Sequence, residues 1–207
     1  GTEIDHITLQ GGWVSPDAGA IGDSVYSNLT LAQYVDQSGS GYNSDSYRGL
    51  VIDYNTNFNG SVSGTSGCSF HDMQIRGFGW LIGMSKNGVT LNADALNFYN
   101  ISLGDAKQAI NSYQGQEKGN VFRNLYCWSN VHTLFTSGID GNGQGGEYTI
   151  DVANIAGGVI RVFNVNQTGW NGIHVSNMFC EQIVTIGTVY SDVPIQFDNC
   201  TFDFRYP

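Results

Sequence analysis

An internal repeat constrains the fold of this chain more than any other feature of its sequence. Each copy begins at an apolar residue, called position zero here, and continues with Asn or Asp two residues later and apolar residues three and five residues later. Six segments follow this pattern, and Gly157 is the one departure from the apolar rule. The copies are Phe70–Ile75, Phe98–Leu103, Phe122–Cys127, Val152–Gly157, Val175–Cys180 and Phe197–Phe202.

The spacing of these copies is typical of a solenoid. Successive position-zero residues are 28, 24, 30, 23 and 22 residues apart, so the core motif is constant while the loops vary in length. A second apolar group follows each position zero after about ten to twelve residues, as at Leu81-Ile82 and Leu134-Phe135. Each copy therefore predicts short strands separated by tight turns. Leucine-rich repeats and β-propeller blades have different signatures, which do not fit this chain.

The Asn or Asp at position two has a physical reason. These residues tolerate left-handed backbone and bond to nearby main chain, so a bend that recurs at one place in each rung selects them. Stacked at the strand spacing of about 4.8 Å, their side-chain amides can form a ladder. We therefore expect an all-β fold, a right-handed single-stranded parallel β-helix of about six or seven rungs.

The first third of the chain is less regular. A looser copy, Ile4–Leu9, has His6 in place of Asn or Asp and predicts the first rung. Residues 10–66 hold a strand candidate, Leu50–Tyr54, and a short helix candidate, Leu29–Val35. We expect residues 1–67 to form the first rung plus an irregular insertion or cap, and residues 68–207 to form the repeats of one continuous domain. Because structured sequence begins abruptly at Gly1, we also expect a segment of a longer protein.

Composition excludes several classes of function. The chain has 18 acidic and 8 basic residues, a net charge of −10 and no cluster of Lys or Arg, so we expect no nucleic-acid partner. No apolar run approaches the roughly 18 residues of a membrane span, and the first residues do not form a signal peptide, so we expect no membrane insertion. Charged residues are only 13% of the chain, so Asn, Ser, Thr, Gln and Gly must supply much of the polar surface.

Taken together, these repeats resemble those of the right-handed parallel β-helix proteins, the pectate-lyase-like group that includes polysaccharide enzymes and bacteriophage tailspikes. The resemblance covers residues 68–204 and includes no catalytic motif of the family. Rungs rich in Asn and Gly, with free cysteines, look more like a tailspike or tail-fibre segment than a secreted lyase. That resemblance implies a homotrimer, in the virion tail or otherwise extracellular, that attaches to a bacterial surface polysaccharide and often cleaves it. Fold alone does not establish the function.

The cysteines and the Gly-rich loop give no sign of a metal or cofactor. All four cysteines occupy inward positions of the repeat, and Cys-x-x-Cys spacing is absent, so we interpret them as small core residues: Cys68, Cys127, Cys180 and Cys200. Four buried thiols suit assembly in a reducing cytoplasm. Residues 140–147 match G-x-G-x-x-G but follow no βα unit, and their likeness to a calcium loop is faint, so we interpret them as a flexible loop.

The outward positions of the repeat define the candidate site. If positions three and five point inward, positions four and six point outward and stack into two columns. Position four holds Gln74, Ser102, Tyr126, Ala156, Phe179 and Thr201, and position six holds Arg76, Gly104, Trp128, Gly158, Glu181 and Asp203. Exposed aromatic rings on a rigid sheet are costly unless something covers them, and sugars stack on such rings. We predict that substrate is bound by Trp128, Tyr126, Phe179, Arg76 and Gln74.

Glu181 and Asp203 are the predicted catalytic or sugar-binding acids. They occupy consecutive rungs, so their backbones are about 5 Å apart, within reach of the roughly 5 to 9 Å carboxyl separations that glycosidases use. The alternatives are that both are solvated surface acids, or that a neighbouring subunit covers the aromatic rings. On another outward face, Asp151, His174 and Arg123 offer competing groups without a specific constellation.

The function expected from the sequence is a tailspike- or tail-fibre-type adhesin that recognises a bacterial surface polysaccharide. One alternative is a glycoside hydrolase or lyase that works through the acidic outward column of the same β-helix. Another is a purely structural shaft. Sugar binding without product release favours the adhesin, release of reducing ends favours the enzyme, and inertness to every glycan favours the shaft.

Overall fold

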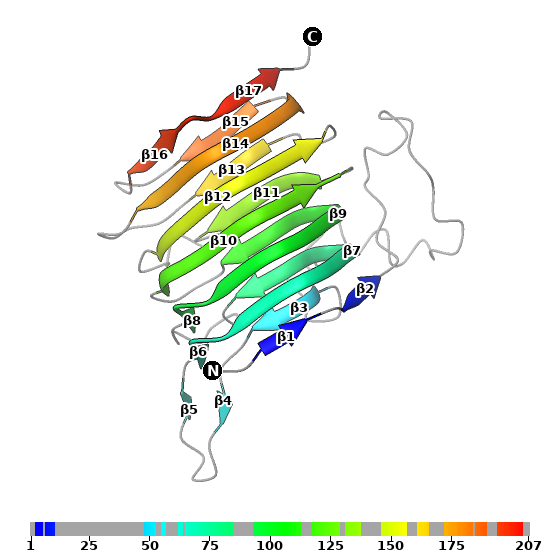
Figure 1. Ribbon diagram of the computed structural model, residues 1–207, viewed down its shortest axis with the longest axis vertical. Helices are drawn as coiled ribbons and strands as arrows, with labels where there is room; N and C mark the ends of the chain where they lie inside the picture. The colour runs from blue at the N-terminus through cyan, green and yellow to red at the C-terminus, as the bar shows by residue number, and fades with distance from the viewer. Residues whose placement is uncertain are drawn as a thin grey trace.

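The chain winds into a parallel β-helix, shown as a computed structural model in Figure 1. The structure describes residues 3–5, 7–10, 48–52, 55–56, 62–63, 65–84, 93–112, 117–128, 131–137, 146–156, 161–165, 172–183, 185–189 and 194–204. Within these ranges every regular element is a strand. In Figure 1 the near strands run from left to right, the far strands return, and the path climbs toward the C-terminus. This path is right-handed, so the predicted fold class is confirmed.

The first wall of the β-helix is a stack of parallel strands that carries the repeat motif. Neighbours in this stack pair in parallel from the N-terminal to the C-terminal end. In order along the wall they are β1 (Glu3–Asp5) with β2 (Thr8–Gln10), β7 (Ser69–Met84), β9 (Asn97–Ser112), β10 (Glu117–Cys127), β12 (Gly146–Ala156), β14 (Ile173–Ile183), and β16 (Ile195–Asp198) with β17 (Thr201–Phe204).

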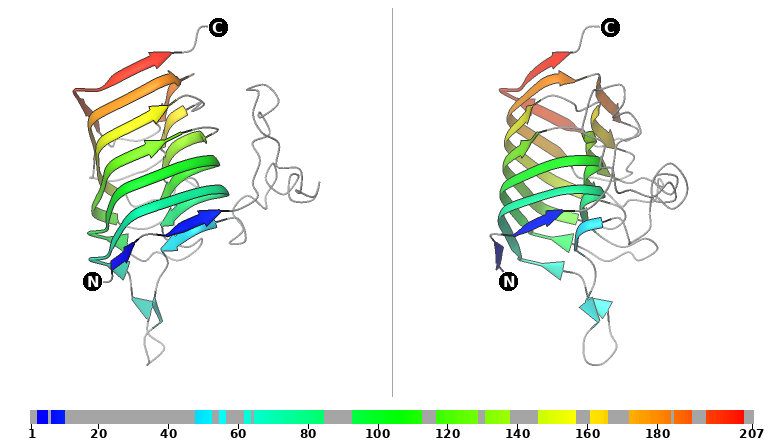
Figure 2. Two further views of the ribbon diagram at one scale, coloured as in Figure 1. Left: turned by 45° about the vertical axis from the view of Figure 1, so that its right-hand side comes forward. Right: turned by 90° about the vertical axis from the view of Figure 1, so that its right-hand side faces the viewer.

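A second wall lies behind the first and holds the second apolar group of each copy. It is formed by β3 (Arg48–Ile52), the C-terminal halves of β7 and β9, β11 (Val131–Ser137), β13 (Arg161–Val165) and β15 (Thr185–Val189). Figure 2 shows the two walls joined at their edges by the bends of β7 and β9. Two small pairs flank the N-terminal end: β4 (Asn55–Thr56) with β5 (Val62–Ser63), and β6 (Thr65–Ser66) with β8 (Ala93–Asp94).

Bends recur at fixed positions because single residues there adopt left-handed backbone. At position two the φ angles lie between 50° and 56°, and the residues are Asp72, Asn100, Asn124, Val152, Asn177 and Asn199, called the bend column below. A second bend, at position seven, uses Gly77, Asp105 and Gln182, and a third, three residues before position zero, uses Gly67, Ala95 and Gly119. The predicted reason for Asn at position two is therefore confirmed.

Apolar side chains fill the space between the walls. At position zero, Phe70, Phe98 and Phe122 stack with ring centroids 5.0 and 4.7 Å apart. Phe135 from the second wall packs edge-on against Phe122 at 6.4 Å, which joins the two walls. Residues at positions three and five are buried in the levels from β7 to β14, as at Met73 and Ile75, and partly buried in the last level. The inward and outward assignment made from the sequence is thus confirmed for this wall.

The looser copy at Ile4 is the first rung. Ile4 pairs with Phe70 and Leu9 pairs with Ile75, the register that the repeat predicts. The strand candidate at Leu50 is also confirmed, as β3, whereas the helix candidate Leu29–Val35 lies outside the described residues. Because the end levels are incomplete, the complete turns are slightly fewer than the six or seven rungs expected.

The register predicted for the fifth copy is wrong by two residues. Phe122 pairs with Ile150, and Ile150 pairs with Val175, so Ile150 and not Val152 is position zero. Val152 then occupies the bend column with φ 55°, in place of Asn154. Asn154 moves to position four and Ala156 to position six, where Ala156 pairs with Glu181. The two outward columns therefore contain Asn154 and Ala156 in place of Ala156 and Gly158.

Candidate functional site

The bend column divides the outer surface of the first wall into two faces. Its side chains form hydrogen bonds from level to level: Asn100 donates to Asp72 at 3.1 Å, and Asn124 donates to Asn100 at 2.7 Å. At the C-terminal end Asn199 donates to Asn177 at 2.8 Å. Because these bonds run parallel to the strand pairing, they add a second set of contacts between levels. Side chains on either side of the column are therefore held at fixed spacing.

The first face, called the aromatic face here, consists of positions four and six of each level after the bend. Tyr126 and Phe179 lie at position four, and each leaves 45% of its surface exposed. Asn154 stands between them, because Tyr126 pairs with Asn154 and Asn154 pairs with Phe179. Two strand spacings separate the rings, roughly 9 to 10 Å. Gln74 is exposed in the same column, nearer the N-terminal end.

Arg76 and Trp128 meet across the intervening level. The guanidinium carbon of Arg76 lies 5.5 Å from the centroid of the indole, within the range of a cation–π contact. Gly104 lies at position six of the level between them and makes this contact possible, because a Cβ there would lie 2.8 Å from Cε2 of Trp128. The indole thus covers the backbone of Gly104. Its Nε1 is buried without a hydrogen-bond partner in the described part of the chain.

The two predicted acids lie at the C-terminal end of the same face. Phe179 pairs with Thr201 and Cys180 pairs with Phe202, so Glu181 and Asp203 each follow the last pair in register on two adjacent levels. Both side chains are exposed. A bulge follows immediately at Gln182, whose φ is 54°, so the register shifts before Ile183 pairs with Phe204. Glu181 and Asp203 are therefore neighbours on adjacent levels, beside the Phe179 ring.

The predicted site residues thus share one face but form two groups. Phe179, Glu181 and Asp203 lie together at the C-terminal end. Arg76 and Trp128 form the second group, and Tyr126 belongs to it because it lies two residues before Trp128, at the end of β10. About five strand spacings, roughly 24 Å, separate the levels of Arg76 and Asp203. An extended ligand could contact both groups, whereas a monosaccharide could contact only one.

On the other side of the bend column, Asp151 collects several polar partners. Ser176 Oγ donates to its Oδ1 at 2.7 Å, Asn177 Nδ2 donates to the same oxygen at 3.0 Å, and Arg123 Nε lies 3.5 Å from Oδ2. The hydrogen bonds from Ser176 and Asn177, with a smaller effect of the Arg123 charge, lower the pKa of Asp151 below its ordinary value. The carboxylate is therefore held in its charged form as a link between three levels.

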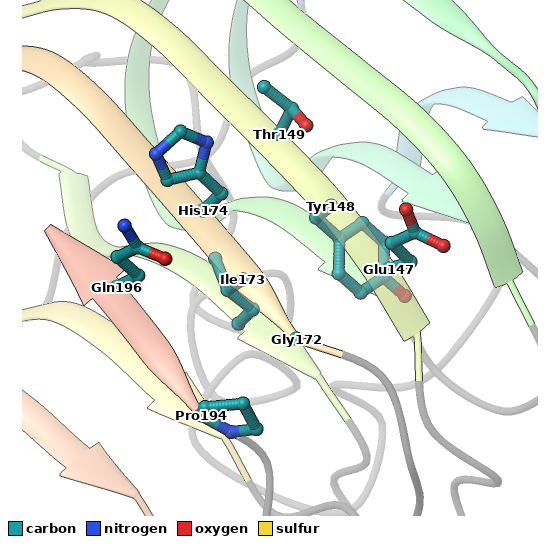
Figure 3. Close-up of a pocket in the computed structure, with 8 residues that line it drawn as sticks. All are labelled: Glu147, Tyr148, Thr149, Gly172, Ile173, His174, Pro194 and Gln196. Carbon is teal, nitrogen blue, oxygen red and sulfur yellow. The ribbon is translucent and has the colours of Figure 1, made fainter. Parts of the chain in front are cut away.

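A cleft of about 420 Å³ opens on this second face and was missed by the sequence analysis (Figure 3). The residues that line it come from three successive levels. They include Glu147, Thr149, Gly172, His174, Pro194 and Gln196. The sequence signal was the column three residues before position zero, with Gly172 between Glu147 and Pro194. The wrong register of the fifth copy moved Glu147 out of that column.

The four thiols line the interior as expected. Cys127 and Cys180 are buried, and Cys68 and Cys200 pack against the core from half-buried positions. Burial raises the pKa of Cys180 to about 12 and raises that of Cys127 as well. Among the described residues there is no group of three side chains that could hold a metal ion, and no helix there is long and apolar enough to cross a membrane.

Comparisons with protein-family models, with curated proteins and with solved structures found no match.

Proposed function

We propose that this chain is an adhesin domain that binds a bacterial surface polysaccharide along its aromatic face. The observation that carries the proposal is the pair Tyr126 and Phe179, each 45% exposed in one column of a rigid parallel sheet. Apolar rings left in water are costly, and a pyranose ring that stacks on them removes that cost. Their separation of roughly 9 to 10 Å is comparable to the length of a disaccharide unit. The levels present side chains at regular spacing, and a polysaccharide presents sugar rings at regular spacing along its length.

The resemblance to tailspikes extends the proposal to a homotrimer carried on the virion tail or otherwise outside the cell. A trimer gives the aromatic rings a second possible role, since a neighbouring subunit could cover them. Sedimentation analysis of the wild-type chain and of a Tyr126→Ala, Phe179→Ala double variant separates the two roles. In the proposed role the variant keeps the oligomeric state of the wild type. Loss of assembly in the variant would instead assign the rings to a subunit interface.

The direct test measures binding of capsular polysaccharide and lipopolysaccharide extracts by calorimetry. Tyr126→Ala and Phe179→Ala are each expected to weaken binding about tenfold or more, the loss of roughly 1.4 kcal/mol or more that a stacked ring contributes. Phe204→Ala is the matched control, because Phe204 is similarly exposed at 47% but lies outside the aromatic columns. Unchanged affinity in both variants, or inertness of the wild type to every glycan, would leave a structural shaft as the better account.

A depolymerase is the second candidate, favoured by the adjacency of Glu181 and Asp203 beside Phe179. Carboxyl groups on adjacent levels, whose backbones are about 5 Å apart, can reach the separations of about 5 to 9.5 Å that glycoside hydrolases use. The test is an assay for reducing ends and unsaturated uronates during incubation with the same extracts. Product release that disappears in a Glu181→Gln, Asp203→Asn double variant supports the enzyme. Binding without product release supports the adhesin.

A further inference from the structure

We propose that the cleft on the second face is a separate binding site for a short neutral saccharide. This inference rests on the proposed function for carbohydrate as the class of ligand, but it concerns different residues on the other side of the bend column. Gly172 lines the cleft between Glu147 and Pro194, and Pro194 lies directly against it. The volume of about 420 Å³ lies in the usual range for small-molecule sites.

The scaffold around the cleft is fixed by main-chain hydrogen bonds. The Tyr148 N–H donates to the Gly172 carbonyl at 3.0 Å, and the Ile173 N–H donates to the Pro194 carbonyl at 3.0 Å. Tyr148 also lines the cleft; it is buried, and its hydroxyl lies 2.5 Å from Ser112 Oγ. The three levels that supply the polar side chains therefore cannot slide past one another. A ligand would meet groups that are already in place, which lowers the entropy cost of binding.

The polar groups suit the hydroxyls of a sugar. Thr149 pairs with His174, and His174 pairs with Gln196, so a hydroxyl, an imidazole and an amide follow one another at about 4.8 Å. Each of these groups can both donate and accept hydrogen bonds, as sugar hydroxyls do. Figure 3 shows His174 and Gln196 side by side, with the Glu147 carboxylate on the other side of Ile173. A carboxylate accepts hydrogen bonds from two hydroxyls, and the Pro194 ring offers an apolar surface to C–H groups.

The charges around the cleft favour a neutral ligand over an acidic one. Glu147 lines the cleft, and Asp151 and Asp198 lie two residues after the lining residues Thr149 and Gln196 on the same strands. Arg123, on the neighbouring level formed by β10, is paired with Asp151 at 3.5 Å. The chain as a whole carries a net charge of −10. A uronate or a phosphorylated sugar would therefore be repelled, whereas a hexose would not.

The test is a titration followed by NMR of chain labelled with ¹³C-histidine. The chain has four histidines, and a His174→Gln variant identifies the signal of His174. The probes are glucose, galactose, mannose, rhamnose, N-acetylglucosamine and their disaccharides, with glucuronate as the anionic match. We expect a saturable shift of the His174 signal with at least one neutral sugar and at least about tenfold weaker binding of glucuronate than of glucose. Gln196→Ala should abolish the shift, while Thr201→Ala, a control on the same level outside the cleft, should retain it.

Further variants keep this inference distinct from the proposed function. In the Tyr126→Ala, Phe179→Ala double variant the His174 shift should persist, although polysaccharide binding by the aromatic face is lost. Loss of the shift in that variant would refute a separate site. Absence of any His174 shift, while the wild type still binds polysaccharide, would overturn the cleft inference and leave the proposed function standing. Tighter binding of glucuronate than of glucose would overturn the assignment to neutral sugars.

Discussion

Asn177 donates its Nδ2 hydrogen bond to Oδ1 of Asp151 at 3.0 Å, one residue away from Val152, which occupies the bend column on the level below. Val152 has no amide or carboxylate to receive that bond. Its φ of 55° also places a β-branched side chain in left-handed backbone, where steric strain is greatest. The ladder of the bend column is therefore interrupted at one level, and Asp151 accepts the hydrogen bond of Asn177 from the neighbouring position.

Replacing Val152 with Asn should stabilise the protein. The change relieves the strain of a β-branched residue at positive φ and supplies an amide between Asn124 and Asn177. We expect the free energy of unfolding to rise by about 1 to 2 kcal/mol. For a chain of this size, each kcal/mol of added stability raises Tm by roughly 2 to 4 °C. Urea and thermal unfolding followed by circular dichroism would measure both.

Val152→Thr is the matched control for this prediction. It adds polarity at the same exposed position but keeps the β-branch and brings no amide. A gain for Val152→Asn without a gain for Val152→Thr would support the conformational explanation. Equal gains in both variants would mean that replacing an exposed apolar group, and not the backbone or the ladder, is responsible.

Removing an intact ladder residue should have the opposite effect. Asn100 donates to Asp72 and accepts from Asn124, and its φ is 56°. We expect Asn100→Ala to destabilise the protein by about 2 to 3 kcal/mol, because it loses both bonds and places Ala in left-handed backbone. Asn100→Gly should cost less, since Gly tolerates this backbone. Chemical unfolding of the two variants separates the backbone effect from the ladder effect, and equal losses would show that the backbone conformation does not matter.

The error in the fifth copy shows what a repeat can and cannot specify. A slip of two residues keeps Ile155 pointing inward and Asn154 pointing outward, so part of the pattern survives it, although Val152 is then wrongly placed inside and Ala153 outside. The motif was assigned to Asn154 because Asn is the common bend residue. Only Gly157, at an expected apolar position, indicated that the match was poor. The true register is set by burial of Ile150, Ala153 and Ile155 against their neighbours, which a local pattern does not contain.

The candidate face was predictable because it follows directly from the period of the strand. Positions four and six point outward in every correctly registered copy, so the sequence placed Tyr126, Phe179 and Glu181 on one face. The contact between Arg76 and Trp128 was not predictable, because it depends on the indole folding back across Gly104. The cleft was missed for a related reason: it is formed by residues of three successive levels, whose relative positions a single copy of the repeat does not contain.

The hydrogen bond from Ser176 to Asp151 should make stability depend on pH. Because the folded pKa of Asp151 is lowered from 3.8, its contribution is full above pH 3.8 and is lost as the pH falls through the lower folded value. Ser176→Ala removes the largest cause of the shift, so the pKa of Asp151 should rise toward 3.8. Stability at neutral pH should fall by about 1 kcal/mol, and the difference from the wild type should shrink in acid. Carboxyl ¹³C titration and urea unfolding from neutral to acidic pH measure these effects.

An Asp151→Asn background provides the control for the pH effect. Asn at this position can still accept from Ser176 but carries no charge to titrate. In that background the effect of Ser176→Ala should no longer vary with pH in the acid range. A difference that stays constant with pH in the original background would show that the Ser176 bond does not depend on the charge of Asp151.

Gly104→Ala should displace the indole of Trp128 without straining the backbone. The new Cβ would lie 2.8 Å from Cε2 of the ring, and Gly104 is not among the described residues with positive φ, so the side chain must move. Moving it breaks the contact with Arg76, and we expect a loss of about 0.5 to 1 kcal/mol in stability and a shift in tryptophan emission. Spectra of each protein minus its Trp128→Phe counterpart isolate the signal of this one ring. Ser102→Ala, two residues earlier on the same strand, is the matched control and should leave the emission unchanged. Wild-type emission and stability in Gly104→Ala would mean that the indole does not rest on Gly104, and would contradict the described contact between Arg76 and Trp128.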